Sequence, residues 1–182
     1  MLRNEKSRPV NFQADYAQRS HFCEVFEQDM DALYLLAFLL TANHQDAESC
    51  FASTLDEAFQ QKTVFKDWAR TWVRRCLIRA AIRMACPTSS KTTATREFWG
   101  DTQDLIARDG EIDAVTRLAP LERFVFVMSV LERYSTWDCS LLLGVSTKKV
   151  VTAQLRALRR LPNPATFFVG AEISPHRMQV TA

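Results

Sequence analysis

Glycine and strand-like alternation are both scarce in this chain of 182 residues, which has four glycines and six prolines. Alternation of apolar and polar residues, the pattern of half-buried strands, is hard to find. Helical periodicity instead recurs from about residue 19 to 84 and again from about 112 to 161. Helical periodicity with little strand alternation predicts an all-α protein, and the 47% apolar content is enough to build its cores.

Histidines and paired cysteines are also few. The chain has three histidines and five cysteines, none of them in a C-x-x-C pair, which argues against a zinc site. Catalysis would require a glycine-rich phosphate loop or clustered His, Cys and carboxylate groups, and no such pattern occurs. His44 and Glu48 are four residues apart, but a histidine near a helix start is usually solvated. We therefore expect no enzyme, catalytic residue, metal or cofactor, and free thiols in a cytoplasmic protein.

Long hydrophobic runs and an excess of one charge sign are missing as well. The longest apolar run, from Ala32 to Ala42, is far short of the roughly 20 residues that a membrane span requires, so we expect a core helix and no membrane contact. Lys and Arg total 23 against 21 Asp and Glu, a net charge of +2. Whether the protein can bind a polyanion therefore depends on how these charges are distributed along the chain.

The first helical block is predicted to span residues 1–85. Helices are expected over Asp29–Ala42, Asp46–Phe59 and Phe65–Met84. Asp46 is expected to cap the second helix, because its carboxylate can accept amide hydrogens of the first turn. The apolar residues expected in the core of these antiparallel helices are Leu33, Leu36, Phe38, Leu40, Phe51, Leu55, Phe59, Trp68, Trp72 and Leu77.

The second helical block is predicted over residues 111–161, after a linker over residues 86–110. The linker contains Pro87, a Ser/Thr cluster and Gly100, which interrupt any long helix, although Phe98 and Trp99 indicate that part of it docks. Pro120 suits the first turn of a helix. Residues 162–182 are expected to form an irregular tail, with a strand in TFFVG as an alternative.

The stretch STWDCSLLLGVSTKKVVTAQLRALRRL predicts a helix-turn-helix. The first helix is expected over Thr136–Leu143, the turn at Gly144, and a cap for the second helix at Ser146 or Thr147. Between Lys148 and Leu161 the chain has five basic residues and no acidic one. The second helix therefore suits the major groove of DNA. Its candidate DNA contacts are Lys148, Lys149, Thr152, Gln154, Arg156 and Arg159. The alternative is an ordinary helical hairpin with a solvated basic face.

The third helix of the first block is a second basic candidate. At about 100° per residue its arginines form two rows that flank an apolar stripe. These candidate nucleic-acid contacts are Arg70, Arg74, Arg75, Arg79 and Arg83. The helix before it is acidic, which favours a protein partner on that side. The alternative is that the arginines only solubilise the helix and cover its core.

The two blocks together resemble the sigma-70 family of bacterial RNA polymerase sigma factors, specifically the small two-lobe extracytoplasmic-function type. DALYLLAFLLTANHQDAESCFASTLDEAF and FKDWARTWVRRCLIRAAIR are similar to region 2, and LAPLERFVFVMSVLERYSTWDCSLLLGVSTKKVVTAQLRALRRL is similar to region 4. The likeness covers about residues 24–84 and 111–161. It implies two small helical lobes on a linker, and a factor that directs core RNA polymerase to promoter DNA.

The resemblance also implies roles for matching positions. The arginine helix would face the minus-ten element and its melted strand, and the helix-turn-helix would read the minus-thirty-five element. The helix that contains Ala47 would contact the clamp helices of the largest polymerase subunit. The polymerase contacts implied there are Asp46, Glu48, Ser49, Ala52 and Ser53. Monomeric free protein, and an anti-sigma factor as a further partner, are also expected.

This chain departs from the family pattern at named positions. After Glu48 the family usually continues with Asp and then Gln-Glu, whereas the run here is SCFAS. The family's usual Asn and Asp fall at Arg75 and Arg79. Two other functions therefore stay open: a stand-alone helix-turn-helix regulator, expected to be dimeric, and a sigma-like adaptor that binds only protein.

Overall fold

The structure, a computed structural model, describes residues 15–88 and 109–161. Within these residues the protein is all-α, as predicted, and the only β pairing is an isolated bridge between Tyr16 and Phe65. No helix in the described part is long and apolar enough to cross a membrane. The predicted tail, the Phe98 and Trp99 positions and most of the predicted linker lie outside the described residues.

The first block is a bundle of three helices that pack against one another: α1 (Arg19–Thr41), α2 (His44–Gln60) and α3 (Ala69–Ala85). A short 3-10 turn, η1 (Lys66–Trp68), precedes α3. Helix α1 begins ten residues before the predicted start, because Phe22 and Phe26 are buried and extend its apolar stripe by two turns. The apolar stripe, rather than the change in polarity near Asp29, therefore determines where the helix begins.

Two further predictions in this block are wrong. Asp46 does not cap α2, because Asn43 is the N-cap and its side chain accepts a hydrogen bond from the Asp46 backbone N–H at 3.0 Å. Trp68 is not a core residue, since 70% of it is exposed in the turn η1. Of the other predicted core residues, Phe51, Leu55, Phe59 and Trp72 are partly buried and the rest are buried.

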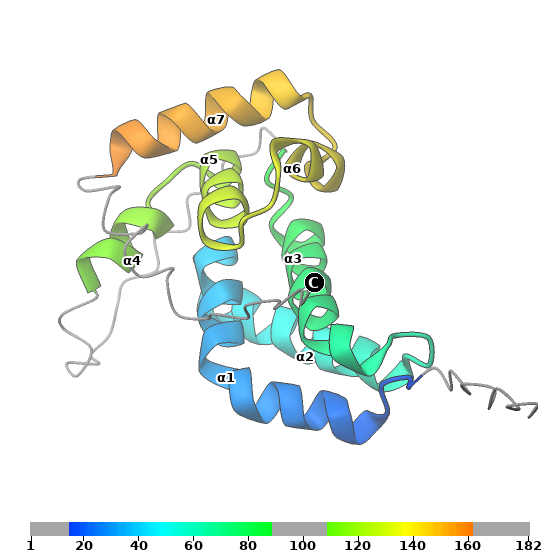
Figure 1. Cartoon of the computed structure of the whole chain (residues 1–182). Helices are drawn as coiled ribbons and strands as arrows, with labels where there is room; N and C mark the ends of the chain where they lie inside the picture. The colour runs from blue at the N-terminus through cyan, green and yellow to red at the C-terminus, as the bar shows by residue number, and fades with distance from the viewer. Residues whose placement is uncertain (1–14, 89–108, 162–182) are drawn as a thin grey trace, which may run out of the picture.

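The second block contains α4 (Asp109–Thr116), α5 (Pro120–Phe126), the π-helical turn η2 (Val127–Leu131), α6 (Thr136–Leu143) and α7 (Thr147–Arg160). Pro120 occupies the first turn of α5, as predicted. Helix α7 packs across α5 and α6, and Figure 1 shows it as the outermost helix of this block. Its buried residues Val150, Ala153 and Ala157 form the stripe that faces α5 and α6.

The two blocks pack against each other through α1, which contacts α4, α5 and η2. Arg123 of α5 is 7% exposed, and its guanidinium donates hydrogen bonds to the carbonyls of Leu40 (3.0 Å), Thr41 (3.1 Å) and Thr116 (3.1 Å). Burial lowers the pKa of Arg123 to about 10, so the side chain stays charged at neutral pH. The last turn of α1 has no basic residue of its own, so the Arg123 charge takes the place where a cation stabilises the negative end of the helix dipole.

Candidate nucleic-acid interface

The helix-turn-helix is formed as the sequence predicts, and its capping interactions are local. Ser135 caps α6 by accepting the Asp138 N–H, and Ser146 caps α7 by accepting the Lys149 N–H at 3.3 Å. Gly144 between them has φ of 64°, in the left-handed region that glycine adopts without strain. These contacts fix the angle at which α7 leaves the turn.

The solvent face of α7 carries most of the predicted DNA contacts. Lys148, Lys149, Thr152, Arg156 and Arg159 are exposed, and Gln154 is half-buried. The Thr152 hydroxyl donates to the Lys148 carbonyl at 2.8 Å.

This face is not purely basic, because it also carries two exposed apolar side chains. Val151 and Leu155 are 44% and 51% exposed and lie one turn apart. Their spacing, opposite Val150, Ala153 and Ala157, could have revealed them in the sequence. Arg160 instead pairs with the buried Glu122 at 2.6 Å and ties α7 to α5.

The arginines of α3 form a second surface, but four of the five are paired within the described residues. Arg70 pairs with Asp29 at 2.7 Å, Arg79 pairs with Glu57 at 3.1 Å, and Arg83 lies 3.9 Å from the same carboxylate. Each of these pairs leaves both side chains partly open to solvent, so a phosphate group can still approach the arginines.

Arg74 and Arg75 border the second block. Arg74 pairs with Glu132 at 3.3 Å, whereas Arg75 is exposed and without a carboxylate partner among the described residues. Burial raises the pKa of Tyr134, and the positive charge of the nearby Arg75 partly offsets this rise. The arginine surface therefore continues up to the contact between the blocks.

An exposed aromatic cluster, Tyr16, Phe65 and Trp68, lies at the N-terminal end of α3. The Tyr16 and Phe65 rings stack with centroids 5.1 Å apart, and Trp68 meets Phe65 edge-on at 6.2 Å. The backbone segments that carry Tyr16 and Phe65 are joined by a hydrogen bond that the Ala17 N–H donates to the Val64 carbonyl at 2.7 Å. The sequence does not reveal this cluster, because Tyr16 and Phe65 are distant in the chain and share no local pattern.

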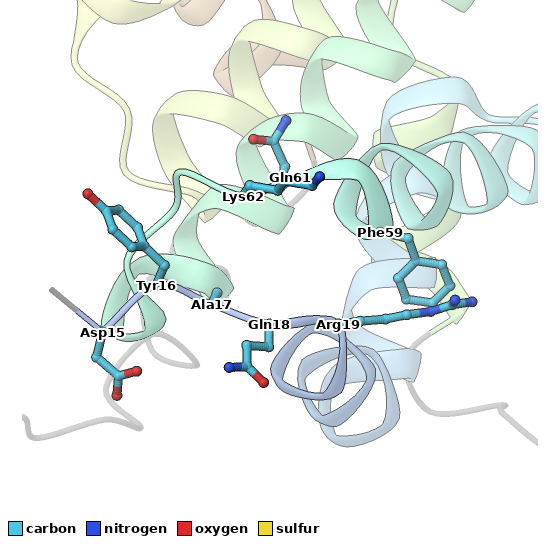
Figure 2. A pocket seen from close by; sticks show the side chains of 8 residues that line it. All are labelled: Asp15, Tyr16, Ala17, Gln18, Arg19, Phe59, Gln61 and Lys62. Carbon is cyan, nitrogen blue, oxygen red and sulfur yellow. The ribbon is translucent and has the colours of Figure 1, made fainter. Parts of the chain in front are cut away.

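A hollow of about 760 Å³ adjoins Tyr16 and is open to solvent. Figure 2 shows Gln61 and Lys62 on one rim and Gln18 on the other, with Arg19 reaching toward Phe59. The Arg19 guanidinium lies 4.2 Å from the centre of the Phe59 ring. Aromatic faces beside Lys and Arg are the combination that binds unpaired nucleotides by stacking and charge.

The outer face of α2 holds the positions predicted for polymerase contact. Glu48, Ser49, Ala52 and Ser53 are exposed on this face, and Asp46 is half-buried. Small side chains along this stripe allow another helix to approach closely. Glu57 of the same helix instead turns toward α3, where it pairs with Arg79.

His44 and the buried cysteines of the described residues lie in separate surroundings. His44 is exposed, and its Nδ1 lies 2.8 Å from the Tyr34 hydroxyl while its ring stacks on Phe38. In the described part of the chain no group of three potential metal ligands comes together. Burial raises the pKa of three thiols to about 11, those of Cys50, Cys76 and Cys139.

The chain matches no protein-family model and no curated protein.

Proposed function

We propose that this protein is a bacterial transcription initiation factor that binds core RNA polymerase and directs it to promoters with two recognition elements. The observation that carries the proposal is the capped helix-turn-helix with an exposed basic face on α7, in the same chain as a separate arginine and aromatic surface. Two DNA-facing surfaces on one chain suit a factor that recognises two elements. Each surface then needs only modest affinity, because tethering raises the effective concentration of the second.

The chemistry of the two surfaces differs in a way that fits two kinds of DNA. Helix α7 offers cationic side chains for phosphates together with Thr152 for a base edge, which suits duplex DNA in the major groove. The exposed rings of Tyr16, Phe65 and Trp68 can stack only on bases that have left the duplex. The α3 surface therefore fits the melted strand of the minus-ten element.

Separation-of-function variants test the proposal with purified core RNA polymerase. Lys148→Glu with Lys149→Glu should leave polymerase binding intact and abolish run-off transcription from duplex promoters. Ser49→Arg with Ser53→Arg on α2 should abolish polymerase binding instead. Arg117→Glu is a single charge-reversal control, because Arg117 is an exposed residue of the second block outside α7. The proposal fails if the wild-type protein neither binds polymerase nor supports transcription.

A second candidate function, a stand-alone dimeric regulator, is favoured by one observation. Trp137 and Leu141 are 63% and 58% exposed and lie one turn apart on α6. Paired apolar side chains beside a helix-turn-helix can join two copies on adjacent half-sites. Analytical ultracentrifugation discriminates the two functions, since a regulator of this kind is dimeric and an initiation factor is monomeric when free.

A further inference from the structure

The outward face of α7 has an apolar side chain at its centre. Val151 and Leu155 are both exposed and lie one turn apart. At about 100° per residue, Leu155 lies about 170° around the helix from the centre of the buried stripe, and Val151 about 125° from it. Leu155 therefore points away from α5 and α6, on the face that the proposed function turns toward DNA.

The side chains around this apolar pair are cationic. Lys148 and Arg159 lie on the same face and are exposed, and α7 has no acidic residue. An apolar protein partner, or a second copy of α7, would bury these cations without an opposite charge, which costs free energy. A polyanion that also presents apolar groups matches both the cations and the apolar pair.

The apolar pair stands on a helix that is held in place. Besides its buried stripe, α7 is tied to α5 by Arg160, which pairs at 2.6 Å with Glu122, whose side chain is 8% exposed. Val151 is β-branched and has one strongly preferred χ1 rotamer in a helix. The Thr152 hydroxyl hydrogen is donated to the Lys148 carbonyl at 2.8 Å, so it is not free for a base acceptor. The centre of this face is therefore better suited to apolar contact than to hydrogen bonding.

The major groove of DNA presents one kind of apolar group, the methyl group on C5 of thymine, among hydrogen-bond donors and acceptors. Cytosine that is methylated at C5 carries the same group at the same ring position. Val151 and Leu155 are four residues apart, which is about 6 Å along the helix axis. Two base-pair steps cover roughly 7 Å. The two side chains therefore match methyl groups on base pairs one or two steps apart.

We propose that Val151 and Leu155 are specificity-determining residues that select duplex sites by the C5 methyl groups of their pyrimidines. This inference rests on the proposed function, because it concerns the base sequence that the same helix recognises. The surrounding cations bind phosphates of any sequence, whereas the apolar pair supplies selectivity without a hydrogen bond. Burial of one methyl group changes the affinity about threefold to fourfold, so two change it about tenfold.

The test changes only the methyl groups of the DNA. Duplexes are first selected from a random library with the full chain, alone and in complex with core RNA polymerase. Each thymine of a selected duplex is then replaced by deoxyuracil, which removes the methyl group and keeps the base pair. In a second series, cytosine or its C5-methylated form replaces each thymine, opposite guanine. At the positions that α7 contacts, the wild type should bind the deoxyuracil duplex about threefold to fourfold more weakly.

Variants assign this difference to the apolar pair. Leu155→Ala and Val151→Ala should each bring the ratio of thymine to deoxyuracil affinity close to one at one position. Leu155→Met keeps an apolar side chain and should retain most of the ratio. Leu141→Ala is the matched control, because Leu141 is an exposed leucine on α6, outside this face, and the ratio should equal that of the wild type. Circular dichroism establishes that each variant is folded.

The outcomes separate the inference from the proposed function. A deoxyuracil penalty that the Leu155 or Val151 variant loses and the Leu141 variant keeps supports the inference. Tighter binding of methylated than of plain cytosine then identifies either base as the source of the methyl group, and equal binding restricts the source to thymine. Equal affinities of the wild type for thymine and deoxyuracil, or a penalty that every variant keeps, overturn the inference and leave the proposed function standing. If no duplex is selected, with or without polymerase, both are overturned.

Discussion

Replacing Arg123 with methionine removes the buried cation that joins the two blocks and keeps most of its volume. Three carbonyls lose their donor: those of Leu40 and Thr41 at the end of α1 and that of Thr116 in α4. Each buried acceptor left without a partner costs about 1 to 3 kcal/mol. The lower end applies here, because carbonyls at helix ends can recover water and the desolvation cost of the ion disappears as well.

The expected loss of stability is therefore about 3 kcal/mol for Arg123→Met, which corresponds to a decrease of roughly 6 to 12 °C in Tm for a chain of this size. Urea unfolding followed by circular dichroism measures the loss. The stability of Arg123→Lys should lie between those of the wild type and of Arg123→Met, since an ammonium retains the charge but cannot match the three fixed carbonyls.

Arg117→Met is the control, because it removes an exposed arginine from the same block without affecting the buried contact. The expected result for this control is no measurable change. If Arg123→Met is no less stable than Arg117→Met, then the carbonyls of the helix ends are satisfied without Arg123. The account of how the blocks dock would then be refuted.

Three further predictions concern single groups. Because burial holds the pKa of its thiol near 11, Cys139 should resist alkylation at pH 8 in the native protein, whereas the exposed Cys86 should react, as read by mass spectrometry. Gly144→Ala should destabilise the protein by about 1 to 2 kcal/mol in urea unfolding, because its φ is 64°. Leu155→Ala should reduce the preference for thymine over deoxyuracil in selected duplex sites, because an exposed apolar side chain on α7 can contact the thymine methyl group. Equal binding of thymine and deoxyuracil sites by the wild type would contradict this last prediction.

The first helix and the turn of the helix-turn-helix could be predicted to the residue because their signals are local, whereas the sequence left the cap of the second helix open between Ser146 and Thr147. Ser135, Gly144 and Ser146 act within one turn of the chain, through caps and one positive φ. Helix α6 therefore has the bounds that the sequence predicts. The predicted start of α1 at Asp29 is ten residues late, because the polar residues Glu27 and Gln28 separate the buried Phe22 and Phe26 from the rest of the apolar stripe.

The contacts that join the two blocks are between residues distant in the chain and could not be predicted. Arg123 lies 83 residues from Leu40, and Arg74 lies 58 residues from Glu132. No local pattern distinguishes these partners from other charged or polar residues. The prediction that Trp68 lies in the core is wrong for a related reason, because its burial depends on which element packs over η1.

The measurement that tests the central claim most directly is transcription by core RNA polymerase on a genomic fragment library, with and without this protein, followed by mapping of transcript starts. The account predicts new starts that share two upstream elements and disappear with the Lys148→Glu and Lys149→Glu variant. Sequence-selective DNA binding without any polymerase complex or new transcript would contradict it, and would favour the stand-alone regulator.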